Sequence, residues 1–167
     1  MKKLLLFVVI AFVSFCANAQ FYLGGTAGIS VNTVDRYATT SAVICPELGY
    51  KFNQIWAVGA SIDAGYSNER GGYGIIGFAP YARAIFAHVQ SVSFFADAAL
   101  PYYTLISDGD SESMFSIGLR PGFLVNLNDN LQLQARATFV SIGLSGNNTS
   151  IGLAIANEFS LGVIYNF

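Results

Sequence analysis

One glycine pattern in the sequence has the spacing of a nucleotide-binding motif. Residues 72–77 read Gly-Tyr-Gly-Ile-Ile-Gly, the pattern that holds a dinucleotide pyrophosphate at the start of a helix. This chemistry needs a strand before the glycines and a helix after them. Here the following residues, Phe78-Ala79-Pro80-Tyr81, continue the alternation that is typical of a strand. We therefore interpret the glycines as loop and strand positions, and we predict no cofactor.

Residues that commonly serve in catalysis or metal binding are few and scattered. His88 is the only histidine, and Cys45 is the only cysteine after the first nineteen residues. Triad catalysis and zinc sites both need further side chains that converge on one point. Asp108, Asp110 and Glu112 could hold calcium, but their spacing lacks an EF-hand pattern, and a solvated loop is the simpler interpretation. We predict no catalytic residue, no metal ligand and no enzyme activity.

Eight charged residues lie within segments where apolar and small or polar residues alternate. Period-two alternation indicates β-strands with two different faces. We expect strands at about 21–33, 41–52, 55–66, 73–86, 92–104, 114–126, 131–143 and 151–167. All eight charges fall on the small, polar face, four acidic and four basic: Glu47, Lys51, Asp63, Arg83, Asp97, Arg120, Arg136 and Glu158. Because ions in a confined interior must be paired, we predict one central network that includes a contact between Asp97 and Arg120.

The composition indicates that the opposite, apolar face lies against lipid. Charged residues make up 11% of the chain and the mean hydropathy is +0.50, whereas soluble domains average about 25% charged residues. After the N-terminal segment no apolar run is long enough for a membrane helix. A closed β-barrel is the other structure that satisfies its backbone groups within lipid. A soluble ligand-binding barrel remains an alternative, but its outer surface would be expected to carry many more charges.

The connections between the expected strands alternate between short and longer. Turns at 53–54, 88–91 and 128–130 are short, and the connections at 33–40, 67–72, 105–113 and 145–150 are longer and polar. Outer-membrane barrels have this arrangement, with tight turns in the periplasm and looser loops outside. The apolar face also carries aromatic residues toward both ends, as these barrels do. We predict an all-β, eight-stranded, antiparallel up-and-down transmembrane barrel, whose narrow interior is filled by side chains.

The first nineteen residues are typical of a cleavable signal peptide. Met1, Lys2 and Lys3 precede twelve residues, 4–15, of which only Ser14 is polar. As a helix this run would span only about 18 Å, short of a hydrocarbon core of about 30 Å. We expect cleavage after Ala19, which divides the chain into a signal peptide at 1–19 and a barrel domain at 20–167. The remaining part has six basic and ten acidic side chains, which argues against nucleic-acid binding.

The strand at the end of the chain resembles the last strand of proteins in a known family. Phe159, Leu161, Val163, Tyr165 and Phe167 form an alternating strand that finishes on phenylalanine. The whole of residues 20–167 is similar to the small outer-membrane barrels of the OmpA-like and OmpX-like kind, including the outer membrane β-barrel domain. The resemblance implies that Tyr165 and Phe167 are read by the outer-membrane assembly machinery. It also implies contacts with outer-membrane lipids and lipopolysaccharide, and we expect a monomer. The chain stops after the last strand, so cell-wall tethering is not implied, and its short loops argue against a protruding adhesive sheet.

Two functions follow from these expectations. The first is a non-enzymatic barrel in the outer membrane of a Gram-negative bacterium, with an ion-paired, plugged lumen and a role in envelope structure or surface interaction. The alternative is a narrow, porin-like channel for small solutes. The interior ions discriminate between the two, because a plugged lumen predicts negligible conductance.

Overall fold

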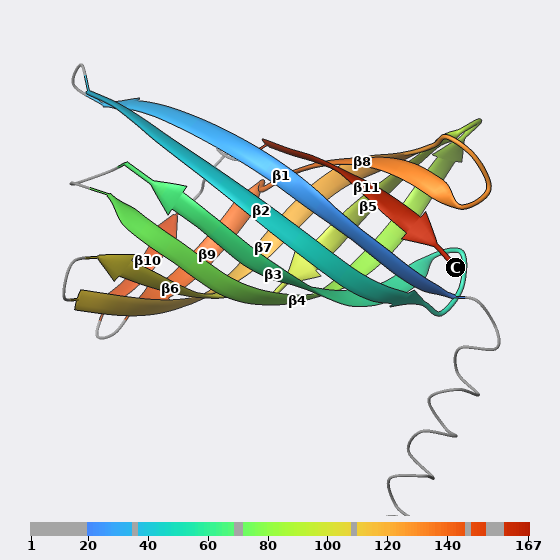
Figure 1. Ribbon diagram of the computed structural model, residues 1–167. Coiled ribbons are helices and arrows are strands. Elements are labelled where there is room, and N and C mark those ends of the chain that lie inside the picture. The colour runs from blue at the N-terminus through green and yellow to red at the C-terminus, as the bar shows by residue number, and fades with distance from the viewer. Residues whose placement is uncertain (1–19, 35–36, 69–71, 108–109, 146–147, 153–158) are drawn as a thin grey trace, which may run out of the picture.

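The computed structural model describes residues 20–34, 37–68, 72–107, 110–145, 148–152 and 159–167, and the predicted signal peptide at 1–19 lies outside them. No helix within these ranges is long and apolar enough to cross a membrane. The described chain consists of strands, drawn in Figure 1: β1 (Phe21–Val34), β2 (Tyr37–Lys51), β3 (Trp56–Ser67), β4 (Tyr73–Val89), β5 (Val92–Ala99), β6 (Tyr102–Ser107), β7 (Asp110–Asn126), β8 (Leu131–Ala137), β9 (Val140–Ser145), β10 (Asn148–Gly152) and β11 (Phe159–Asn166).

These eleven segments form eight barrel strands, because three pairs of segments are successive parts of one strand. The first pair is β5 and β6, which both pair with β4 and with β7. Pro101 lies between them and cannot donate a backbone hydrogen bond. The second pair is β8 and β9, which both pair with β7. The third is β10 and β11, which pair with β9 and β8 respectively.

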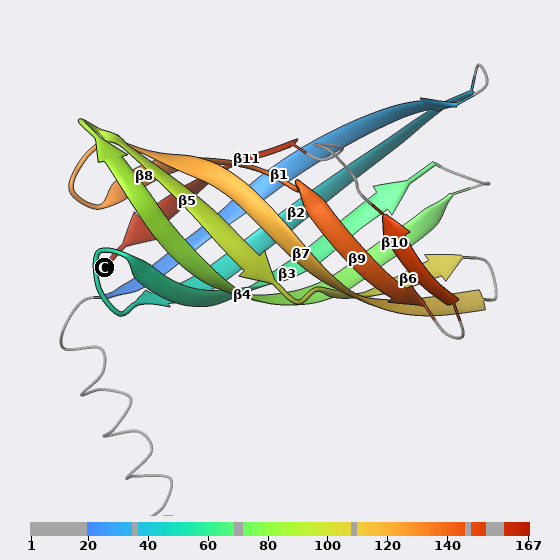
Figure 2. The ribbon, with the colours of Figure 1, turned by 180° about the vertical axis from the view of Figure 1, so that it is seen from behind.

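The sheet closes on itself through its first and last strands. β1 pairs antiparallel with β2 along one edge and with β11 along the other. Beside this seam the Phe167 amide donates to the Phe21 carbonyl over 3.1 Å, so both ends of the barrel domain lie at the short-turn end. Figure 1 and Figure 2 show the closed wall from opposite sides. The predicted eight-stranded antiparallel barrel is therefore confirmed.

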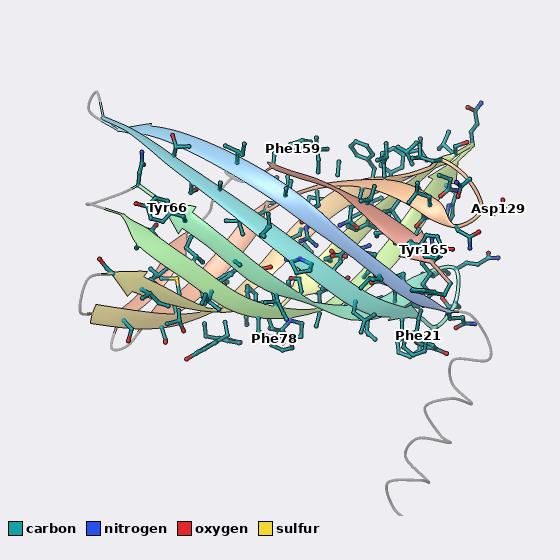
Figure 3. All side chains as sticks on the ribbon, viewed as in Figure 1. Phe21, Tyr66, Phe78, Asp129, Phe159 and Tyr165 are labelled. Atoms are coloured by element: carbon teal, nitrogen blue, oxygen red, sulfur yellow. The ribbon has the colours of Figure 1, made fainter. Side chains whose placement is uncertain are left out.

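Most of the bulky apolar side chains point away from the barrel axis. Phe94 and Phe95 illustrate the alternation, since the first is 38% exposed and the second is completely buried in the interior. Phe78 and Phe159 likewise project outward from the wall in Figure 3, each about half exposed. An outer face of this kind belongs against lipid rather than water, and the pairing of neighbouring strands around the closed sheet satisfies backbone groups that lipid cannot.

The strands are longer at the loop end than the sequence pattern predicts. β4 and β7 each have 17 residues, and a tilted membrane crossing needs only about 9–11. The expected loop at 33–40 is largely a ladder that extends to the pair Val34–Tyr37. The expected acidic loop at 105–113 is likewise paired as far as Ser107–Asp110. The expectation that these two segments are loops is therefore wrong, because most of their residues are paired in strands; in Figure 1 the ends of β1 and β2 rise away from β3.

Candidate functional site

The interior near the short-turn end contains a layer of apolar and aromatic side chains. The layer, which we call the apolar layer, comes from six barrel strands and is at most 8% exposed: Tyr22, Ala57, Ile85, Phe95, Leu124 and Ile164. Two glycines leave room for its rings. A Cβ at Gly49 would overlap the Tyr22 ring, and one at Gly122 would lie 2.5 Å from Cζ of Phe95. The absence of side chains at these positions therefore allows aromatic rings to cross the lumen.

An ion pair between neighbouring strands lies next to the apolar layer. Arg83 on β4 is directly opposite Asp97 on β5. Its Nε donates to Oδ1 of Asp97 over 2.7 Å and its Nη2 donates to Oδ2 over 2.9 Å, with both residues at most 2% exposed. The Arg83 guanidinium also lies 4.0 Å from the centre of the Phe95 ring and 5.2 Å from that of Tyr81. Bidentate bonding and aromatic stacking together hold this guanidinium in one orientation.

A second ion pair crosses the lumen. Nη1 of Arg136 on β8 donates to Oε2 of Glu47 on β2 over 2.9 Å. Nε2 of Gln134 donates to the other carboxylate oxygen of Glu47 over 3.1 Å, and Nη2 of Arg136 donates to Oγ1 of Thr26 over 3.0 Å. All four residues are at most 5% exposed. These bonds connect strands that are not neighbours in the sheet, so the second pair bridges the interior.

The other predicted members of the ion network are placed separately. Asp63 is buried and accepts a hydrogen bond from Ser61 over 3.0 Å. Lys51 lies at the short-turn end and donates to the side chain of Asn166. Glu158 lies outside the described residues. The single central network of the sequence prediction is thus, among the described residues, two ion pairs with separate polar groups around them.

The sequence predicts a contact between Asp97 and Arg120, and the register that suggested it is correct, but no ion pair joins the two side chains in the described part of the chain. The two residues are directly opposite each other on β5 and β7. Asp97, however, has an arginine opposite it on each side, and both of its oxygens accept from Arg83. Arg120 is 8% exposed, and its Nε and Nη2 have no hydrogen-bond partner in the part of the chain that the structure describes.

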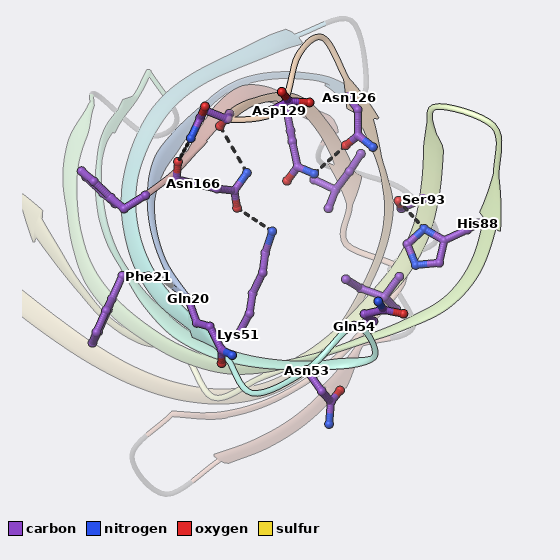
Figure 4. Close-up of a pocket in the computed structure, with 15 residues that line it drawn as sticks. Gln20, Phe21, Lys51, Asn53, Gln54, His88, Ser93, Asn126, Asp129 and Asn166 are labelled. Carbon is purple, nitrogen blue, oxygen red and sulfur yellow. Dashed lines mark hydrogen bonds between the residues drawn. The ribbon is translucent and has the colours of Figure 1, made fainter. Parts of the chain in front are cut away.

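A polar cavity of about 680 Å³ opens at the short-turn end, on the other side of the apolar layer (Figure 4). Ile85 and Leu124 of the apolar layer are among its lining residues. The rest of the lining is rich in amides and includes one lysine, one histidine and one carboxylate: Gln20, Lys51, Asn53, Gln54, His88, Ser93, Asn126, Asp129, Asn130, Gln132 and Asn166, with the rings of Phe21 and Phe167. We call this cavity the vestibule.

The vestibule contains one pair of side chains that are familiar from catalysis. His88 Nδ1 lies 2.8 Å from Oγ of Ser93, and the two residues are opposite each other in the β4–β5 hairpin. Ser93 is only 3% exposed, so little of this residue is accessible from the vestibule. Among the described residues, no group of three or more His, Cys, Asp and Glu side chains is arranged to hold a metal. The pair is therefore accounted for as a hydrogen bond between neighbouring strands.

The prediction from charge alone missed the aromatic part of the interior. Tyr22 and Tyr81 point inward, and their hydroxyl oxygens lie 2.9 Å apart. The alternation contains the signal that would have found them, because Tyr81 is two positions from Arg83 and Phe95 is two positions from Asp97. Residues two apart on a strand share a face, so the charged residues identify their aromatic neighbours as interior too.

A comparison of the sequence with models of known protein families identifies the family of this chain. Residues 4–167 match the model described as the outer membrane protein beta-barrel domain. The chain belongs to this family. Among curated proteins no sequence matches it. Solved structures add a likeness in fold. Neisserial surface protein A is 16% identical with a TM-score of 0.62, and the alignment covers 88% of this chain and 97% of that one.

Two further outer-membrane barrels have a similar fold. The attachment invasion locus protein Ail of Yersinia pestis is 18% identical with a TM-score of 0.56, and the alignment covers 89% of this chain and 98% of that one. The N-terminal barrel domain of Pseudomonas aeruginosa OprF is 14% identical with a TM-score of 0.52, over 89% and 98% of the two chains. Membership of the outer membrane β-barrel domain family fits a role in the envelope or at the cell surface.

Proposed function

We propose that this barrel is a non-enzymatic protein of the outer membrane of a Gram-negative bacterium, with a closed lumen and a role in envelope structure or surface interaction. The observation that supports a closed lumen is the succession of the apolar layer and the two ion pairs along its interior. A hydrated ion would have to displace packed rings at the first level and separate two buried charge pairs at the second. Both steps are costly in a water-poor interior.

The conductance of the purified protein in planar lipid bilayers tests this proposal. We expect no steady single-channel current from the wild-type protein. Phe95→Ala removes a fully buried ring from the apolar layer, and we expect it to raise the frequency of current events. Phe94→Ala is the matched control, because it removes the same side chain from the lipid-facing position next to it. Steady currents from the wild-type protein would instead favour the narrow porin-like channel.

The proposed surface role concerns the long-loop end of the barrel. In the sequence, the connections at this end contain five acidic residues, Asp35, Glu69, Asp108, Asp110 and Glu112, and two basic ones, Arg36 and Arg70. Ail was solved in complex with the heparin analogue sucrose octasulfate. A net negative charge opposes binding of such a polyanion, so we propose that a surface partner of this barrel is cationic or is bound through a divalent cation. Immobilised heparin should not retain the protein at low salt.

The proposed partners within the envelope follow from the outer face and the chain end. Aromatic side chains at the short-turn end include the edge-to-face pair Tyr165 and Phe167, whose ring centres are 5.2 Å apart. We propose that such rings contact the headgroups of outer-membrane lipids, with lipopolysaccharide at the opposite end, and that these two residues form the assembly signal. We propose a monomer without nucleic-acid partners. Membrane fractionation with a carbonate wash tests the location, since a soluble barrel would be released.

A further inference from the structure

Three neighbouring strands place two arginines on either side of one carboxylate. Arg83 on β4, Asp97 on β5 and Arg120 on β7 are directly opposite one another in register. Both oxygens of Asp97 accept hydrogen bonds from Arg83. Arg120 is nevertheless 8% exposed, and among the described residues its buried Nε and Nη2 have no partner. This row of residues therefore carries one positive charge in excess.

The other buried carboxylates among the described residues form hydrogen bonds with groups other than Arg120. Glu47 accepts from Arg136 and Gln134, and Asp63 accepts from Ser61. No ion pair links either of them to Arg120 within the described part of the chain. An arginine side chain does not lose its proton in a protein, so it cannot become neutral to relieve the burial. A buried charge without a counter-charge is strongly unfavourable.

We propose that Arg120 holds a small monovalent anion, represented by chloride, in the centre of the lumen. Nε and Nη2 form one edge of the guanidinium, so their two N–H groups converge on a single acceptor. Arg83 uses the same edge to hold Asp97. The ring of Tyr81, 5.5 Å from Cζ of Arg120, lies close to this guanidinium. One bound chloride would bring the charge of the row to zero.

The narrow interior and the single excess charge of the row favour chloride over larger anions. The interior of an eight-stranded barrel is only wide enough for its own side chains, so a phosphate or an organic carboxylate would have to displace packed residues. A divalent anion would also replace an excess of positive charge by an excess of negative charge. The proposal goes beyond a closed lumen, because a bound chloride neither requires nor predicts a conducting path.

Chloride-dependent stability tests the site. The full-length mature protein is refolded in detergent and unfolded with urea while potassium gluconate is replaced by potassium chloride at constant ionic strength. Trp56, the only tryptophan, reports unfolding by fluorescence. Once chloride exceeds its dissociation constant, a tenfold rise in chloride should raise the folded-to-unfolded ratio about tenfold for one site. Arg120→Met should abolish this dependence, whereas Lys51→Met, which removes an equal charge at the vestibule, should retain it.

Direct localisation gives a second and independent measurement, which does not depend on the variant folding. Crystals of the wild-type protein grown with bromide in place of chloride should show an anomalous peak within hydrogen-bond distance of Nε and Nη2 of Arg120. The proposal is overturned if the wild-type protein shows no chloride dependence, or if Arg120→Met shows the same dependence. It is also overturned if bromide is found only at surface positions while Arg120 binds water. None of these results bears on the bilayer conductance, so the two proposals fail separately.

Discussion

Replacement of Asp97 by asparagine should remove a large part of the stability of the barrel. The change keeps the shape of the side chain and removes the charge that Arg83 binds with two hydrogen bonds of 2.7 and 2.9 Å. Asp97 is completely buried and Arg83 is 2% exposed, so water cannot replace the lost carboxylate. Hydrogen bonds to charged groups contribute about 1.5–3 kcal/mol each, and loss of one partner of a buried pair costs about 3–5 kcal/mol. We therefore expect the free energy of unfolding to fall by about 3–5 kcal/mol.

The assay is urea unfolding in detergent, followed by Trp56 fluorescence, in gluconate buffer so that no halide can take the place of the carboxylate. Asp129→Asn is the control, since it makes the same chemical change in an exposed turn, and it should leave the unfolding midpoint unchanged. The double variant Arg83→Met with Asp97→Leu should be more stable than Asp97→Asn alone, because it removes both charges of the ion pair and does not leave Arg83 unpaired. A loss in Asp97→Asn no larger than in Asp129→Asn would refute the assigned role of the ion pair.

Further substitutions test the packing, the membrane face and the chain end. Gly122→Ala should lower the free energy of unfolding by about 1–3 kcal/mol, because its Cβ would clash with the Ala135 carbonyl and the Phe95 ring. Gly74→Ala is the control, since its Cβ would approach only a carbonyl at 3.9 Å. In the same urea titration it should leave the free energy of unfolding almost unchanged. Ile62→Arg, in the middle of the lipid face of β3, should lower the free energy of unfolding from lipid vesicles by about 2–4 kcal/mol. Tyr66→Arg lies near the loop end, where the loss should be smaller. Equal losses for the two variants would contradict the assigned membrane position. Phe167→Ala should reduce the amount of barrel in the outer-membrane fraction of cells without preventing refolding in detergent, and equal losses in both measurements would point to a folding defect instead.

The architecture could be predicted from the sequence because the same alternation of outward and inward residues repeats along the strands of the barrel. Alternation fixes which residues face lipid, and low charge with no long apolar run leaves a closed barrel as the fold. The strand ends could not be predicted as well. The ladders of β2 and β7 begin several residues before the expected starts at 41 and 114, because polar residues such as Thr39 and Ser113 also pair well in a hairpin that leaves the lipid.

The partners of the ions could not be predicted from the sequence either. Register is a backbone property, and the pairing of Asp97 with Arg120 was inferred correctly at that level. The choice between two arginines opposite one carboxylate is made by side-chain packing. Arg83 is held by the Phe95 and Tyr81 rings, and this stacking was not visible in the charge pattern. Charge alternation thus identifies the interior residues without identifying their bonds.

The row of Arg83, Asp97 and Arg120 also bears on how the barrel selects its register. A slip of one residue between β4 and β5 would turn every side chain of one strand to the other face and place a buried ion in lipid. After a slip of two residues, every side chain still points to its original face of the sheet, but Asp97 no longer lies opposite Arg83. Such a slip is therefore disfavoured by the loss of the ion pair and of the close contacts at the glycines. The apolar residues of the outer face are similar to one another, so they favour the correct register only weakly over a register shifted by two residues. We therefore expect the buried charges to contribute to a unique register, and Asp97→Asn should broaden the refolding kinetics in addition to lowering stability.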